Sequence, residues 1–117
     1  MESNTRKLIG EIQDEVFKSS ELTPNRAAEI LTMTSALLGN INDKIKNTEI
    51  IYNKKLLECF DQEEKANRAK IIAETSIEYE NKLTARNTKE LAVEIARSLK
   101  YYLRAKEEEL RLSNNQQ

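Results

Sequence analysis

Apolar residues recur at three- and four-residue steps along most of the chain, which is the spacing of one face of a helix. One such segment covers residues 3–18. The next begins at Thr23-Pro24, where threonine can cap a helix and proline suits the first helical position. From there to Leu112 the only other glycine or proline is Gly39, and the pattern stays in phase across it. The sequence predicts helices over about residues 3–18, 24–60 and 62–112, followed by a polar tail at 113–117.

The long charged stretch has to fold back or pack against other chains. A single helix over Asn40–Leu112 would be roughly 110 Å long, at about 1.5 Å per residue. Asp61, with Glu64 three residues later, resembles a capping box and favours a bend there. A rival turn lies at Thr84–Thr88, but the apolar positions stay in one sector through Asn87. We therefore expect an all-α fold in which a short N-terminal helix precedes a long antiparallel helical hairpin.

The seam between the two arms of this hairpin is rich in alanine and poor in large side chains. Small residues let helices approach closely but bury little apolar area, so a lone hairpin would be marginal. We therefore expect a coiled-coil-like homo-oligomer in which further copies complete the core. The predicted seam consists of Leu38, Ile41, Ile45, Leu56, Ile77, Leu91, Ile95, Leu99 and Leu103.

The composition indicates one helical domain without catalytic machinery. Of the 117 residues, 38% are hydrophobic, 33% are charged and none is histidine, so the commonest general base is missing. Cys59, the single cysteine, has no histidine partner and falls in the apolar sector, where we expect it to be buried. The acidic run around Asp61 matches no calcium loop or ferritin-like site, and two glycines provide no phosphate loop. We expect no enzymatic activity, no catalytic residue, no metal and no cofactor.

The sequence also suggests where the protein resides. No apolar run approaches the ~20 residues of a membrane span. The charged start of the chain lacks the pattern of a secretory signal peptide, and one cysteine allows no intrachain disulfide. We expect a cytoplasmic protein without membrane contact, in the host cytoplasm if the chain is phage-encoded.

The net charge of −1 conceals an uneven distribution, because residues 81–106 carry seven basic and only two acidic side chains. On one continuous helix six of these basic residues fall within about 80° of arc, opposite the apolar sector. Such a row can follow a phosphate backbone while a neighbouring tyrosine stacks on an unpaired base, although a solvated helix face is the alternative. The predicted nucleic-acid-binding residues are Lys82, Arg86, Lys89, Arg97, Lys100, Tyr101 and Arg104, with a more dilute second cluster at Lys44, Lys46, Lys54 and Lys55.

The first half of the chain resembles a known family. The similarity rests on Val16-Phe17, Ser19-Ser20, Leu22, Ala27-Ala28, Ser35 and Leu38, followed by a lysine-rich amphipathic helix. Over roughly residues 8–60 the chain is similar to the T4-type phage recombination mediators, the UvsY-like family. The resemblance implies a small, helical, oligomeric protein that binds single-stranded DNA and helps to load the phage recombinase where single-strand-binding protein is present. Only the cluster at residues 44–55 lies inside the matching region.

Together these patterns favour a non-enzymatic, oligomeric accessory protein that binds single-stranded DNA and assists recombinase loading. The alternative is a protein–protein interaction module, such as a phage inhibitor of host defence or an assembly scaffold, whose basic row would meet an acidic partner. A purely structural coiled coil is a third hypothesis. The expected partners are further copies of the chain, single-stranded nucleic acid and, if the resemblance holds, a recombinase or single-strand-binding protein.

Overall fold

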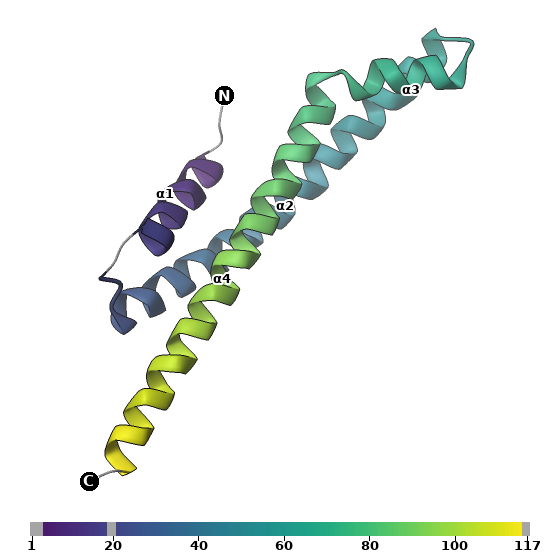
Figure 1. Ribbon diagram of the computed structural model, residues 1–117. Coiled ribbons are helices and arrows are strands. Elements are labelled where there is room, and N and C mark those ends of the chain that lie inside the picture. Colours follow the sequence, from purple (N-terminus) through teal and green to yellow (C-terminus); the bar gives the residue numbers. More distant parts are fainter. Residues whose placement is uncertain (1–3, 19–20, 116–117) are drawn as a thin grey trace. The chain divides into compact units, whose positions relative to one another are not determined.

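The computed structural model describes residues 4–18 and 21–115, and all regular elements in these ranges are helices (Figure 1). They are α1 (Asn4–Lys18), α2 (Pro24–Gln62), α3 (Ala66–Glu74) and α4 (Ile77–Asn115). α2 and α4 are the arms of an antiparallel hairpin, which confirms the predicted all-α fold. α4 includes residues 113–115 of the predicted polar tail, whereas residue 3 and residues 116–117 lie outside the described residues.

Two compact units share these helices and are described one at a time. Unit 1 comprises Met1–Gly39 and Glu90–Gln117, and unit 2 comprises Asn40–Lys89. α2 begins as predicted, because the Arg26 backbone N–H donates to Thr23 Oγ1 at 3.1 Å and Pro24 is the first helical residue. α2 also continues through Gly39, as the phase of its apolar residues predicts.

The predicted single helix over residues 62–112 is wrong, because the fold-back contains the separate helix α3. α2 ends at Gln62, close to the predicted bend, but Asp61 lies inside α2 and forms no capping box with Glu64. A capping residue needs non-helical backbone angles, which a residue inside α2 does not have. The N-cap of α3 is instead Lys65, with an extended backbone (φ −99°, ψ 120°) and no capping hydrogen bond from its side chain.

A second break, which the sequence analysis did not predict, separates α3 from α4 at Thr75-Ser76. Thr75 Oγ1 donates to the Ile72 carbonyl at 2.8 Å, and Ser76 Oγ donates to the Ala73 carbonyl at 2.5 Å. Such local hydrogen bonds offer the backbone an alternative to a continued helix. Ser76 Oγ also accepts from the Tyr79 N–H at 3.3 Å and so caps the start of α4.

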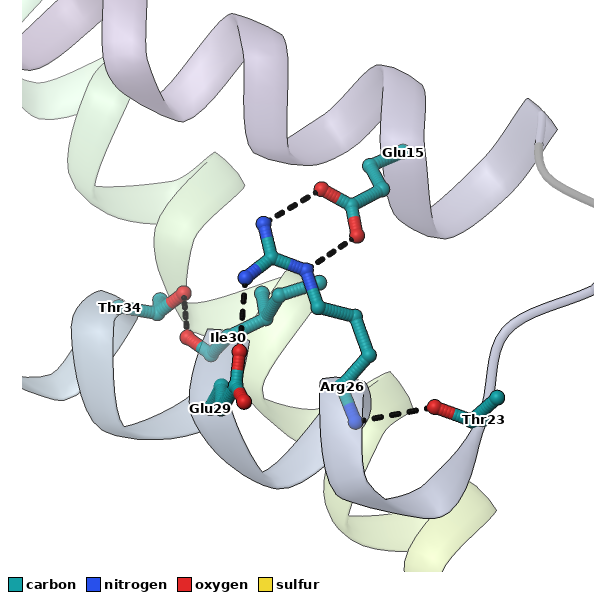
Figure 2. A network of polar contacts seen from close by, with 6 residues as sticks. All are labelled: Glu15, Thr23, Arg26, Glu29, Ile30 and Thr34. Atoms are coloured by element: carbon teal, nitrogen blue, oxygen red, sulfur yellow. Dashed lines mark hydrogen bonds and ion pairs between the residues drawn. The ribbon is translucent and has the colours of Figure 1, made fainter.

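The core of unit 1 combines side chains from α1, α2 and α4. Arg26 of α2 forms a bidentate ion pair with Glu15 of α1, in which Nε and Nη2 donate to the two carboxylate oxygens at 2.6 and 2.9 Å (Figure 2). Its third donor, Nη1, bonds Glu29 at 2.9 Å. The Tyr102 hydroxyl of α4 donates to the Leu22 carbonyl before α2. The buried side chains of this unit are Ile9, Ile12, Ala27, Ile30, Thr34, Ala92, Ile95, Ala96 and Leu99.

The core of unit 2 is narrow and consists largely of small residues. Tyr52 and Cys59 of α2 pack with Ala69 and Ala73 of α3, and Tyr79 of α4 covers this cluster. The two tyrosine rings lie 5.2 Å apart between centroids at an interplanar angle of 49°, a tilted aromatic pair. Burial raises the pKa of the Tyr52 phenol. Cys59 is buried with a free thiol, as predicted.

Most of the predicted seam is packed. Three of its residues are buried (Ile41, Ile95 and Leu99), and five are half-buried (Leu38, Ile45, Leu56, Leu91 and Leu103). Ile77 is the exception, because its side chain is 61% exposed at the first position of α4. The rival turn at residues 84–88 does not form, since α4 runs through it without a break.

Ile77 differs from the other predicted seam residues in its place along the chain. It is the first residue of α4 and directly follows the break at Thr75-Ser76, whereas the other predicted seam residues lie inside α2 or α4.

Candidate nucleic-acid interface

Two basic residues near the start of α4, Lys82 and Arg86, contact α2 within unit 2. Lys82 is half-buried, with its Nζ 4.6 Å from the centroid of the Tyr52 ring. Arg86 donates from Nε, at 3.1 Å, and from Nη2 to Glu49 Oε1. This hydrogen bonding lowers the pKa of the Glu49 carboxyl. Lys82 therefore packs against an apolar ring and does not lie opposite the apolar sector as predicted, whereas Arg86 stays exposed and forms an ion pair with Glu49.

The partners of these two cations, Tyr52 and Glu49, are contacts that the local sequence pattern does not predict. Glu49 and Tyr52 lie three residues apart on α2, so they share the side of that helix that meets α4. Nothing on α4 itself indicates these partners, because they depend on how the two arms are aligned.

The second half of the predicted basic row lies in unit 1 and is exposed. We call this set the cation patch: Arg97, Lys100, Tyr101 and Arg104. The three cations form no ion pair within residues 4–18 and 21–115. Tyr101 is 78% exposed, and residues 95–106 include no acidic side chain. At 100° per residue the cations fall within about 60° of arc, so they form one face of α4.

Several other cations of unit 1 have an acidic neighbour, which distinguishes them from the cation patch. The bidentate pair with Glu15 lowers the pKa of that carboxyl and raises the pKa of the Arg26 guanidinium (Figure 2). Further pairs are Lys18–Asp14 at 3.1 Å, Lys106–Glu109 at 3.5 Å and Arg111–Glu108 at 2.6 Å. The unneutralised positive charge of α4 in this unit is thus concentrated at the cation patch.

The second predicted cluster does not form one surface. Lys44, Lys46 and Lys54 are exposed on α2, whereas Lys55 is half-buried. Lys44 and Lys46 are two residues apart and therefore project about 200° apart around the helix. Lys89 of α4 is exposed as well, and the described part of the chain offers none of these lysines an ion pair.

The described residues offer little for catalysis or metal binding. No group of three or more histidine, cysteine, aspartate or glutamate side chains in this part of the chain is placed to hold a metal ion. Cys59 is buried, so reactants have little access to its thiol. The absence of enzymatic activity stays a prediction.

Two further observations concern the chain as a whole. None of the helices formed by the described residues is long and apolar enough to cross a membrane. The resemblance to the recombination mediators stays a prediction. Comparisons of the chain with protein-family models, with curated proteins and with solved structures find no match.

Proposed function

We propose that this chain is a non-enzymatic accessory protein that binds single-stranded nucleic acid through the cation patch. The observation that carries the proposal is the exposure of three cations beside Tyr101, on a stretch without acidic residues, that form no ion pair with any described residue. From the resemblance of residues 8–60 to the recombination mediators we further propose that the strand is DNA and that the protein assists recombinase loading.

The chemistry of the cation patch suits a flexible strand. Lysine and arginine ammonium and guanidinium groups neutralise phosphates and release counterions, whereas an exposed tyrosine ring offers a face on which any base can stack. Single strands present unstacked bases, which a duplex does not, so Tyr101 favours single strands over duplex. A helix fixed by the core of unit 1 presents these groups without ordering a loop.

Fluorescence anisotropy of a labelled single strand of ~40 nucleotides tests the proposal. Three phosphate contacts give a slope of log affinity against log salt of about −2, so raising salt from about 50 to 200 mM should weaken binding about 20-fold. The variant Lys100→Glu/Arg104→Glu should reduce affinity at low salt and flatten this slope. Replacing Tyr101 with alanine should weaken binding with little change in slope, because stacking releases few counterions.

A matched variant separates local contacts from net charge. Lys44→Glu/Lys46→Glu makes the same change in net charge at exposed, unpaired positions of unit 2. It should retain most of the affinity that Lys100→Glu/Arg104→Glu loses. Loss of binding in the unit 2 variant alone would move the site to α2, and no binding of the wild type at low salt would reject the proposal.

A protein–protein interaction module is the second candidate, and one observation favours it. Unit 2 leaves many large apolar side chains exposed, among them Leu57 at 65%, Ile71 at 64% and Ile77 at 61%. Exposed apolar groups of this kind commonly mark surfaces that bind another protein. Failure of the single-strand experiment would leave this candidate, with an anti-defence inhibitor or an assembly scaffold as its concrete forms.

A further inference from the structure

Unit 2 exposes more of its large apolar side chains than it buries. Within this unit only Ile41 and Tyr52 are large and buried, and its other buried apolar residues are alanine or cysteine. Eight large apolar side chains are at least 40% exposed: Ile50, Ile51, Leu57, Phe60, Ile71, Ile72, Ile77 and Leu83. The apolar surface that would stabilise a unit of this size therefore remains in contact with water.

Part of this apolar surface forms a regular row on α2. Ile50, Asn53, Leu57 and Phe60 follow steps of three, four and three residues, which are the steps between a and d positions of a heptad. All four are exposed, and the apolar members are 44%, 65% and 41% accessible. We call this set the α2 ridge. It points away from the core of unit 2, because the packed positions Thr48, Tyr52, Lys55 and Cys59 lie on the other side of α2.

The α2 ridge can leave water only by packing against a further helix, because the other side of α2 already packs within the chain. We infer that the α2 ridge is a parallel homodimer interface, in which the ridge of one copy packs against the same ridge of a second copy. In a parallel, in-register pair each residue meets its own counterpart, so Ile50, Leu57 and Phe60 form apolar layers. The polar Asn53 then meets Asn53 of the second copy, where two amides can hydrogen-bond.

The polar residue of the ridge decides between the possible arrangements. In an antiparallel pairing a and d positions face each other, which sets Asn53 opposite Leu57 or Ile50 and leaves its amide without a partner. A buried amide without a hydrogen bond is costly, so parallel pairing in register is preferred. A dissimilar apolar partner would leave the same amide unpaired, which is why a second copy fits better than an unrelated apolar helix.

Charges on the flanks of the ridge agree with the parallel pairing. Glu49 lies at a g position and Lys54 at the e position five residues later, the spacing at which parallel helices exchange ion pairs. Arg86 contacts only Oε1 of Glu49, and Lys54 is exposed with no ion pair in the described chain. Lys46 occupies the next d position and limits the ridge to about 16 Å, at 1.5 Å per residue. The dimer is therefore weak and concentration-dependent.

Sedimentation velocity of the full chain over ~1–100 µM tests the dimer without any nucleic acid, so its result is independent of the cation patch. Wild type should shift from monomer toward dimer as concentration rises. Leu57→Glu should raise the dissociation constant at least tenfold, as expected for loss of a central apolar anchor. Ile71→Glu is the matched control, because Ile71 of α3 is 64% exposed in the same unit but lies outside the ridge, and it should change the constant less than twofold.

Cross-linking tests the register. Asn53→Cys in a Cys59→Ala background should form a disulfide-linked dimer on mild oxidation, because facing core positions of a parallel coiled coil lie near the ~6 Å Cα separation that disulfides require. Asn42→Cys in the same background, at an exposed position of α2 outside the ridge, should cross-link far less. A wild-type monomer at all concentrations, a dimer unaffected by Leu57→Glu, or a dimer that Asn53→Cys does not cross-link would each overturn the inference.

Discussion

Truncation of Leu99 to alanine tests the core of unit 1 most directly. The Leu99 side chain is fully buried on α4. The substitution removes three buried carbons, worth about 0.8 kcal/mol each, and leaves a cavity that raises the expected loss of unfolding free energy to about 3–4 kcal/mol. For 117 residues, with an unfolding entropy of about 2.1 cal/mol/K per residue, this loss lowers Tm by about 12–16 °C.

Leu110→Ala is the matched control, because Leu110 lies on the same helix but is 66% exposed. The control should change the free energy of unfolding by less than about 0.5 kcal/mol, since alanine is a good helix former and little apolar contact is lost. Thermal and urea unfolding followed by far-UV circular dichroism measures both variants. Equal losses in the two variants, or a loss below about 1 kcal/mol for Leu99→Ala, would show that α4 is not packed into the unit 1 core as described.

Three other predictions concern polar contacts. Arg26 lowers the pKa of Glu15 below its usual 4.5 through their hydrogen bonds. The ionised carboxylate therefore contributes stability that is present above pH 4.5 and is lost as the pH falls through the lowered pKa. Tm of the wild type should fall more steeply below pH 4.5 than Tm of Glu15→Gln. Tyr102→Phe removes the hydroxyl that donates to the Leu22 carbonyl and should cost about 0.5–1.5 kcal/mol in urea unfolding, whereas Tyr101→Phe, at an exposed ring, should cost nothing measurable. Ser76→Ala removes the cap of α4 and should cost about 1 kcal/mol, which Ser76→Asp, a residue that also caps helices, should largely restore.

The fold class could be predicted from the sequence because helix formation depends on signals local to each segment. Thr23-Pro24 marks the start of α2, and the phase of Leu38 with Ile41 carries the helix through Gly39. The break at Thr75-Ser76 also has a local cause, because the side chains of both residues hydrogen-bond to backbone carbonyls three residues earlier and compete with the helix. Serine and threonine occur inside helices as well, so their presence alone does not predict a break.

The candidate site could be predicted only in part, because the availability of a charge depends on tertiary contacts. The helical spacing of the basic residues depends only on the sequence of α4 and can therefore be predicted from it. Whether a given cation is available to a ligand depends on what the opposite arm places beside it. Glu49 and Tyr52 engage Arg86 and Lys82 through the alignment of two segments more than 25 residues apart, which no local pattern encodes.

The two halves of the basic row consequently have different roles: one contributes to packing and the other is available to a ligand. In unit 2 a cation that is paired or stacked contributes to holding the arms together, and releasing it for a phosphate would first cost that contact. In unit 1 the cations of the patch form no ion pair with the residues that the structure describes, so their electrostatic attraction is available to a ligand. Because an electrostatic surface is effective only where its charges lack partners within the chain, the patch around Tyr101 is a stronger candidate than the longer row predicted from the sequence.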